Sequence, residues 1–260
     1  LNDQTMNELN ATFDELEGNS DVAGIVITSY GGSLAGADIN ELAALPTPEE
    51  AADKCRRGHV ILRRIENCPK PVAIAVDGPV LGGGAELSMA CHARFVGPNL
   101  MLGQPEVNLG IIPGYGGTQR LPRLIGLEKA NELLRTAGTI NATEACQLGW
   151  ATGAPEADPV AAAKDALAAH LNGSAPITRL DTGPMKMPAI LADVDIGHRS
   201  LAIDRILTDA LFAGLATDLD QGLEIEALAF AVCKRTVDYD IGMGNFIQNG
   251  PRIPAVFMHE

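Results

Sequence analysis

The chain has 260 residues, 46% of them hydrophobic, which is enough apolar material for a sizeable core in one or two domains. Its 33 acidic and 19 basic residues give a formal net charge of -14, which argues against nucleic acid or an anionic membrane as a partner. No apolar run approaches the roughly 20 residues that a membrane span needs, and the opening LNDQTMNELN lacks the features of a signal peptide. We therefore expect a soluble, cytoplasmic protein.

Apolar spacing predicts alternating helices and strands over the first 175 residues. The pattern gives a helix over 2–16, a strand over 22–28, a short helix ending at 42, and a long helix over 48–65. A strand over 71–76, a helix over 87–90, a strand over 93–96 and helices over 117–137 and 158–171 follow. This order predicts a mixed α/β domain.

The composition changes after residue 175, where Pro, Gly and Thr interrupt the periodicity over 176–187. Helical patterns then occupy about 197–216, 219–237 and 242–248. We therefore divide the chain into an α/β region over 1–175 and a helical C-terminal region over 176–260.

The cysteines are odd in number and scattered without a CxxC pair, so the sequence indicates neither a disulfide framework nor a metal site. They are Cys55, Cys68, Cys91, Cys146 and Cys233. Cys91 stands next to His92, but adjacent side chains seldom point at each other and no orienting third group is evident. We expect reduced, mostly buried thiols and no catalytic Cys/His pair.

A glycine-rich stretch over 80–121 carries the most informative chemistry. The GGG run at 82–84 follows a predicted strand and opens a helix, so its backbone N–H groups would suit an oxyanion, a phosphate or a thioester oxygen. Glu86 lies in the first turn of that helix, where a carboxylate is also favoured merely by the helix dipole. A nucleotide-binding loop is disfavoured because neither GxGxxG nor GxxxxGK[ST] is present.

Glu106 lies twenty positions after Glu86, among apolar neighbours. An apolar setting raises the pKa of a carboxyl group and makes it a usable acid near neutrality. A second glycine turn, PGYGG at 113–117, opens the next predicted helix. The stretch thus combines two glutamates with two turns rich in backbone donors.

These motifs resemble the crotonase (enoyl-CoA hydratase/isomerase) superfamily, and most closely enoyl-CoA hydratase. The matching pieces are AGAD at 35–38, GGGAE at 82–86, GQPE at 103–106 and IPGYGGTQRL at 112–121, in order and at the spacing of the family. The resemblance covers nearly the whole chain. It implies a spiral of ββα repeats with a helical C-terminal trimerisation region.

The resemblance also implies roles for individual residues in the syn addition of water to an enoyl-CoA thioester. The N–H groups of Ala37 and Gly83 would form an oxyanion hole for the thioester oxygen. Glu86 would deprotonate the water, Glu106 would exchange the proton at C2, and the N–H of Gly114 would help to hold the water. The two carboxyl groups would titrate as a coupled pair.

Coenzyme A would enter as part of the substrate, with no tightly bound cofactor. Ala35, Asp38 and Tyr115 are expected to contact the substrate. Family members often carry a basic residue one turn after the oxyanion-hole alanine, whereas this chain reads DINE at 38–41. We therefore expect a weaker electrostatic grip on the 3'-phosphate. Arg56 and Arg57 would be the substitutes, although a solvated helix face also explains them.

The superfamily supports several reactions, so the fold alone does not define one. Enoyl-CoA isomerases typically keep a carboxylate at the Glu106 position and lack one at Glu86, so the presence of both favours a hydratase. The alternatives left open are isomerase, hydrolase, dehalogenase or decarboxylase chemistry on an acyl-CoA, or a non-catalytic CoA-binding scaffold. A scaffold would usually have lost a glutamate or a glycine.

The resemblance further implies a homotrimer, or a hexamer of two trimers.

The strands that normally precede the first helix in this superfamily are absent, and the chain starts with leucine. We therefore expect either a missing N-terminal segment or a piece of a longer, fused polypeptide. In a fused enzyme, the missing part would be a 3-hydroxyacyl-CoA dehydrogenase. Residues 185–198 do not match the family pattern and are interpreted as an insertion. The nature of the acyl chain is not predicted.

Overall fold

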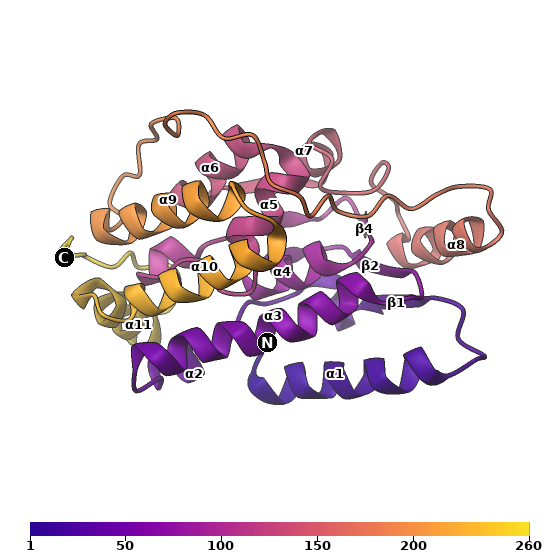
Figure 1. Ribbon diagram of the computed structural model, residues 1–260, viewed down its shortest axis with the longest axis horizontal. Helices are drawn as coiled ribbons and strands as arrows, with labels where there is room; N and C mark the ends of the chain where they lie inside the picture. Colours follow the sequence, from indigo (N-terminus) through magenta and orange to yellow (C-terminus); the bar gives the residue numbers. More distant parts are fainter. Residues whose placement is uncertain (260) are drawn as a thin grey trace.

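The computed structural model describes residues 1–259 and shows a mixed α/β fold, as predicted (Figure 1). Its strands are β1 Ile25–Thr28, β2 Val72–Val76, β3 Pro79–Leu81, β4 Ala93–Val96, β5 Met101–Gly103 and β6 Thr139–Asn141. The helices before residue 175 are α1 Asp3–Gly18, η1 Tyr30–Gly32, α2 Ile39–Ala43, α3 Pro48–Asn67, α4 Gly83–Ala90, η2 Glu106–Leu109, α5 Gly117–Ile125, α6 Leu127–Thr136, α7 Ala142–Gln147 and α8 Pro159–Leu171. The later helices are α9 Leu201–Leu215, α10 Leu219–Cys233 and α11 Val237–Asn249.

The first sheet is parallel, with the strand order β1-β2-β4. Side chains alternate between the two faces of a strand, and β2 uses both faces. Val72 and Ile74 join the main hydrophobic core, whereas Ala73 and Ala75 belong to a smaller cluster with Leu167 of α8. The alanines of VAIAV therefore give α8 a flat surface on one side of the sheet.

The second sheet, in the order β3-β5-β6, carries the reactive stretch. β3 pairs in parallel with β5, and β5 pairs antiparallel with β6. β3 ends at the glycine turn that opens α4, and β5 ends three residues before Glu106. Because parallel strands end at the same edge of a sheet, both glutamate-bearing segments start from one edge.

The long helix α3 runs through the middle of the molecule, between α1 and α10 (Figure 1). Thr47 caps its N-terminus by accepting a hydrogen bond from Glu50 N, and Pro48 occupies the first turn, where no backbone donor is lost. In the C-terminal region, α10 packs on α3 and α9, while α11 packs against α2 and η2. The last helix, α11, therefore covers α2, which precedes the glycine turn at 82–84 in the sequence, and η2, which follows it.

Some predicted boundaries are wrong. The predicted helix over 117–137 is two helices, because Gly126 has φ +85° and ends α5 before α6 begins. The helix predicted over 219–237 ends at Cys233, and the last helix begins at Val237, five residues before the predicted start. The division at residue 175 and the insertion over 185–198 stay predictions.

The five cysteines are free, and all but Cys146 are buried. No helix within residues 1–259 has the length and apolar character needed to cross a membrane.

Candidate active site

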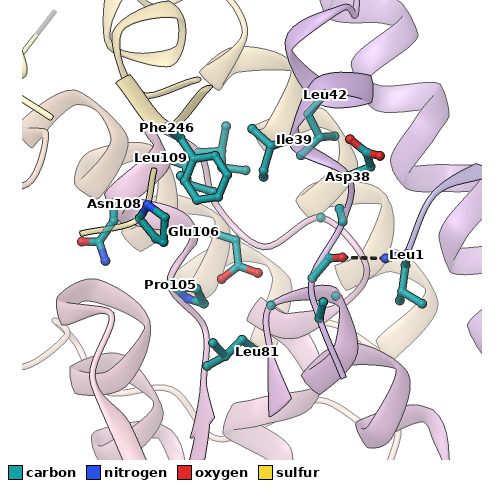
Figure 2. Close-up of a pocket in the computed structure, with 18 of the residues that line it drawn as sticks. Leu1, Asp38, Ile39, Leu42, Leu81, Pro105, Glu106, Asn108, Leu109 and Phe246 are labelled. Carbon is teal, nitrogen blue, oxygen red and sulfur yellow. Dashed lines mark hydrogen bonds between the residues drawn. The ribbon is translucent and has the colours of Figure 1, made fainter. Parts of the chain in front are cut away.

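A cavity of about 970 Å³ lies where the glycine turn, η2, α2 and the C-terminal segment meet. Figure 2 shows the carboxylate of Glu106 projecting into it, with Phe246 and Leu109 on one side and Leu81 on the other. Leu1 and Asp38 lie on the far side of the cavity from Asn108. The cavity therefore places a carboxyl group within a largely apolar wall.

The structure brings the backbone of Ala37 and Gly83 together, although they are 46 positions apart in the sequence. Ala37 N lies only 3.2 Å from the point where a Cβ on Gly83 would stand. Both residues line the cavity, and neither N–H donates a hydrogen bond to another residue within 1–259. Two neighbouring amide groups that donate no hydrogen bond within the described residues thus lie at the cavity wall.

Glu86 projects from the first turn of α4 and is 2% exposed. Its Oε1 accepts hydrogen bonds from Tyr115 N and Gly117 N, both at 2.7 Å. Burial, and then the nearby charges of Glu106 and Glu226, raise the pKa of Glu86 well above its usual range. The two amide donors oppose this shift, because they stabilise the ionised form.

Glu106 opens η2 and is also buried. Burial, reinforced by the charge of Glu226, raises the pKa of Glu106 to about 8. Its Oε2 has no hydrogen-bond partner within residues 1–259. Two amide donors thus favour the ionised form of Glu86, whereas Oε2 of Glu106 accepts no hydrogen bond within residues 1–259.

The segment 114–118 supplies the donors to Glu86. Gly114 lines the cavity, and a Cβ there would stand 2.9 Å from Cys55 Sγ, so a side chain is excluded. Tyr115 also lines the cavity, and its ring packs on α3 over Gly58, where a Cβ would meet it at 2.4 Å. Packing therefore defines the path of this turn.

Glu226 of α10 was missed by sequence reasoning, although it reaches the same turn. It accepts hydrogen bonds from Gly116 N and Thr118 N and contacts His59. The only sequence signal is an acidic residue on the apolar face of a predicted helix, where nothing indicates its partners.

Ala35 and Asp38 line the cavity as expected for substrate contacts. Asp38 also caps α2, since its side chain accepts a hydrogen bond from Asn40 N. Asp38 thus has a structural role as a helix cap in addition to its place in the cavity wall.

The structure does not support Arg56 and Arg57 as contacts for coenzyme A, because neither lines the cavity. Arg56 instead pairs with Glu224 at 2.5 Å and with Asp53 at 2.8 Å. The helical position of Arg56 directs it towards α10 rather than towards the active site.

Other basic residues line the cavity: Lys54, His198, Arg199 and Arg252. Lys54 is already engaged by Asp3 and Glu41. Arg199 and Arg252 form no ion pair within residues 1–259, and the Nε of Arg199 is buried without a partner. These two arginines are the cations available to an anionic ligand.

The residues Cys91 and His92 have structural roles. His92 Nδ1 accepts a hydrogen bond from Val72 N, and Nε2 lies 3.0 Å from Glu66 O, to which it donates. Burial raises the pKa of Cys91 to about 12, so the thiol stays protonated. Both ring nitrogens of His92 are thus engaged by backbone groups.

Comparison with known proteins agrees with this geometry. The sequence model of the family described as enoyl-CoA hydratase/isomerase matches residues 1–181. The chain is 33% identical over 250 residues to the short-chain-enoyl-CoA hydratase of Clostridium acetobutylicum, covering 95% of this chain and 86% of that protein. It is 35% identical over 250 residues to the crotonyl-CoA hydratase of Syntrophomonas wolfei, with the same two coverages of 95% and 86%.

A longer relative and a solved structure also match. The fatty acid oxidation complex subunit alpha of Shewanella amazonensis is 33% identical over 266 residues, which cover 90% of this chain but 36% of that protein. The fold is similar to the crystal structure of an enoyl-CoA hydratase from Rhodobacter sphaeroides 2.4.1, with a TM-score of 0.77 and 20% identity. That match covers 100% of this chain and 86% of the other.

Proposed function

The chain belongs to the enoyl-CoA hydratase/isomerase family, and we propose that it adds water across the 2,3 double bond of an enoyl-CoA thioester to give a 3-hydroxyacyl-CoA. The family predicted from the sequence motifs is confirmed. The observation that carries the reaction type is the presence of two buried carboxyl groups, Glu86 and Glu106, in one cavity with two free amide donors. An isomerase needs only one of these carboxyl groups.

In the proposed mechanism, the thioester oxygen accepts hydrogen bonds from the N–H groups of Ala37 and Gly83. Each such donor is typically worth about 3–4 kcal/mol in the transition state, because negative charge develops on that oxygen. The donors bind the enolate more strongly than the ground-state carbonyl, and this difference lowers the barrier.

Water is held by Glu86 and by the N–H of Gly114, which line the same cavity. Glu86 takes one proton from the water while the oxygen of that water forms a bond to C3. The electrons of the double bond then move towards the carbonyl oxygen of the thioester. Glu106 then donates its proton to C2, which completes a syn addition. The carboxyl pair gains one proton and loses one, so its net charge is the same before and after the reaction.

We further propose that Arg199 and Arg252 contact anionic groups of the substrate, the phosphates of coenzyme A being the most strongly charged. Both line the cavity and are not neutralised by a carboxylate within residues 1–259. Burial also lowers the pKa of Arg199, because its guanidinium is partly removed from water. Coenzyme A would be bound as part of the substrate.

We propose a homotrimer, or a hexamer of two trimers. Large apolar side chains are exposed on the adjacent helices α3 and α10, namely Val60 at 69%, Leu228 at 50% and Val232 at 43%. Leu228 and Val232 are four residues apart and share one helix face. Light scattering after gel filtration tests this proposal, and a monomeric wild-type protein would contradict it.

Fusion to a second enzyme stays a proposal, supported by the match to part of a fatty acid oxidation complex subunit.

The reaction is tested by measuring the loss of enoyl absorbance with crotonyl-CoA. We expect activity in the wild type and at least a 100-fold lower kcat in Glu86→Gln, since general base catalysis typically contributes about 10²–10⁴-fold. Asp204→Asn is the matched control, because Asp204 pairs with Arg135 away from the cavity. Equal inactivity of folded wild type and Glu86→Gln would overturn the proposal.

A further inference from the structure

Glu226 of α10 is a buried carboxylate that the proposed mechanism does not use. It is completely buried, and its two oxygens accept four hydrogen bonds. Oε1 accepts hydrogen bonds from Gly116 N at 2.6 Å and from His59 Nε2 at 3.0 Å. Oε2 accepts hydrogen bonds from two atoms of Thr118, the backbone N at 3.0 Å and Oγ1 at 2.5 Å. Every donor except His59 comes from the turn that opens α5.

That turn is also the source of the donors to Glu86. Glu86 accepts from Tyr115 N and Gly117 N, whereas Glu226 accepts from Gly116 N and Thr118 N. Four successive backbone donors are therefore divided alternately between two carboxylates. The two glutamates are 140 positions apart in the sequence, so only the docking of α10 on α3 and α5 brings them to one turn.

Burying a carboxylate is unfavourable unless its oxygens are well satisfied by donors. Glu226 forms no ion pair with Lys or Arg within residues 1–259, and His59 is its only titratable hydrogen-bond partner. Loss of the carboxylate would leave the N–H groups of Gly116 and Thr118 without acceptors. The turn would then be free to shift and to take its other two donors away from Glu86.

We propose that Glu226, oriented by His59, is a positioning residue that fixes the turn so that Tyr115 N and Gly117 N hold the catalytic carboxylate of Glu86. This proposal rests on the hydratase function proposed above. Holding Oε1 of Glu86 with two donors directs the other oxygen to the water. The titratable groups that interact electrostatically with Glu226 are Cys55 and His59 of α3, Glu86 of α4 and Glu106 of η2.

The first test is Glu226→Gln, which keeps the size of the side chain but replaces one acceptor oxygen by a donor. We expect kcat with crotonyl-CoA to fall about 10- to 100-fold, the loss typical of a misplaced catalytic group, with KM changed less than about threefold. Asp204→Asn is the control for loss of a carboxylate elsewhere, and should leave kcat unchanged. A Glu226→Gln enzyme with kcat within threefold of wild type would overturn the proposal.

His59 offers a rescue experiment. His59→Leu removes the donor to Glu226 Oε1 and should lower kcat, whereas His59→Gln offers an amide donor and should restore most of the activity. Equal losses in the two variants at equal melting temperatures would contradict an orienting role for His59. If Glu226→Gln fails to fold, Thr118→Val together with the His59 pair carries the test; this substitution removes the hydroxyl that donates to Glu226 and accepts from Gln119 Nε2.

A readout independent of turnover separates this proposal from the hydratase function. Carbon-13 labelling of glutamate side chains follows the titration of Glu106 by NMR in wild type and Glu226→Gln. Removing the negative charge of Glu226 should shift the Glu106 titration to lower pH, and the resonance of Glu86 should change through its altered donors. An unchanged Glu86 resonance would overturn the positioning role even if crotonyl-CoA proved not to be a substrate.

Discussion

Glu106 Oε1 lies 2.8 Å from the point where a Cβ on Gly82 would stand. Gly82 has φ +54°, a conformation that residues with a side chain rarely adopt. The glycine before the proposed oxyanion-hole amide of Gly83 thus makes room for Glu106, the acid of the proposed reaction. The turn and the carboxyl group form one unit, although they lie on different elements.

Gly82→Ala should lower both stability and activity. The unfavourable φ should cost about 1–3 kcal/mol of unfolding free energy, and the clash should displace Glu106 and reduce kcat at least tenfold. Gly126→Ala is the control, since Gly126 has φ +85° but no atom within 4 Å of the added Cβ. Urea unfolding and crotonyl-CoA hydration are measured for both. Full activity in Gly82→Ala would show that the close approach to Glu106 is unimportant.

Glu106→Gln should change how stability depends on pH. The pKa of Glu106 is raised to about 8 in the folded state, so the folded protein holds a proton that the unfolded chain releases above about pH 4–5. The wild type therefore loses stability as the pH rises from about 5 to 8, and this contribution levels off above that range.

The Gln variant lacks this titration, so its stability relative to wild type should increase between pH 5 and 8, by roughly 2–4 kcal/mol in total. Urea unfolding across this pH range measures the difference. A constant difference between the two proteins would show that Glu106 is not held protonated by the fold.

Arg199→Ala should weaken substrate binding more than Arg56→Ala. Arg199 lines the cavity without an ion-pair partner, whereas Arg56 is paired with Glu224 outside it. Loss of one charged hydrogen-bond donor to an anion should raise KM about 10-fold, from a contribution of about 1.5 kcal/mol, with little effect on kcat. Steady-state kinetics test the difference, and similar KM values for the two variants would argue against an anion contact at Arg199.

Glu66→Gln should be strongly destabilising. Glu66 binds Arg120 at 2.8 Å, and Arg120 is completely buried. Burial disfavours the charge of Glu66, but Arg120 and Arg63 outweigh it and hold the pKa below the usual range. Removing the carboxylate leaves a buried cation without compensation, which typically costs about 3–5 kcal/mol.

Glu224→Gln is the control for Glu66→Gln, because it breaks only the exposed pair with Arg56 and should cost at most about 1 kcal/mol. Urea unfolding at neutral pH compares the two variants. Equal losses would mean that the Glu66–Arg120 pair contributes no more than a surface ion pair.

The sequence was sufficient to predict the main elements and the candidate catalytic residues. Glycine turns and apolar periodicity are local signals, and Glu86, Glu106, Ala37 and Gly83 stand in motifs that can be read over a few residues. The split at Gly126 was missed because a helical pattern can tolerate an isolated glycine, so the residue alone does not mark a helix end.

What only the tertiary structure decided are the partners of charged side chains. The sequence does not reveal the partners of Arg56 or Arg199. In the structure, Arg56 forms an ion pair with Glu224, whereas Arg199 lines the cavity. Glu226 acquires its role only when α10 docks beside the turn at residues 115–118. Local patterns specify backbone conformation, whereas the function of a charge depends on neighbours that packing brings from distant parts of the chain.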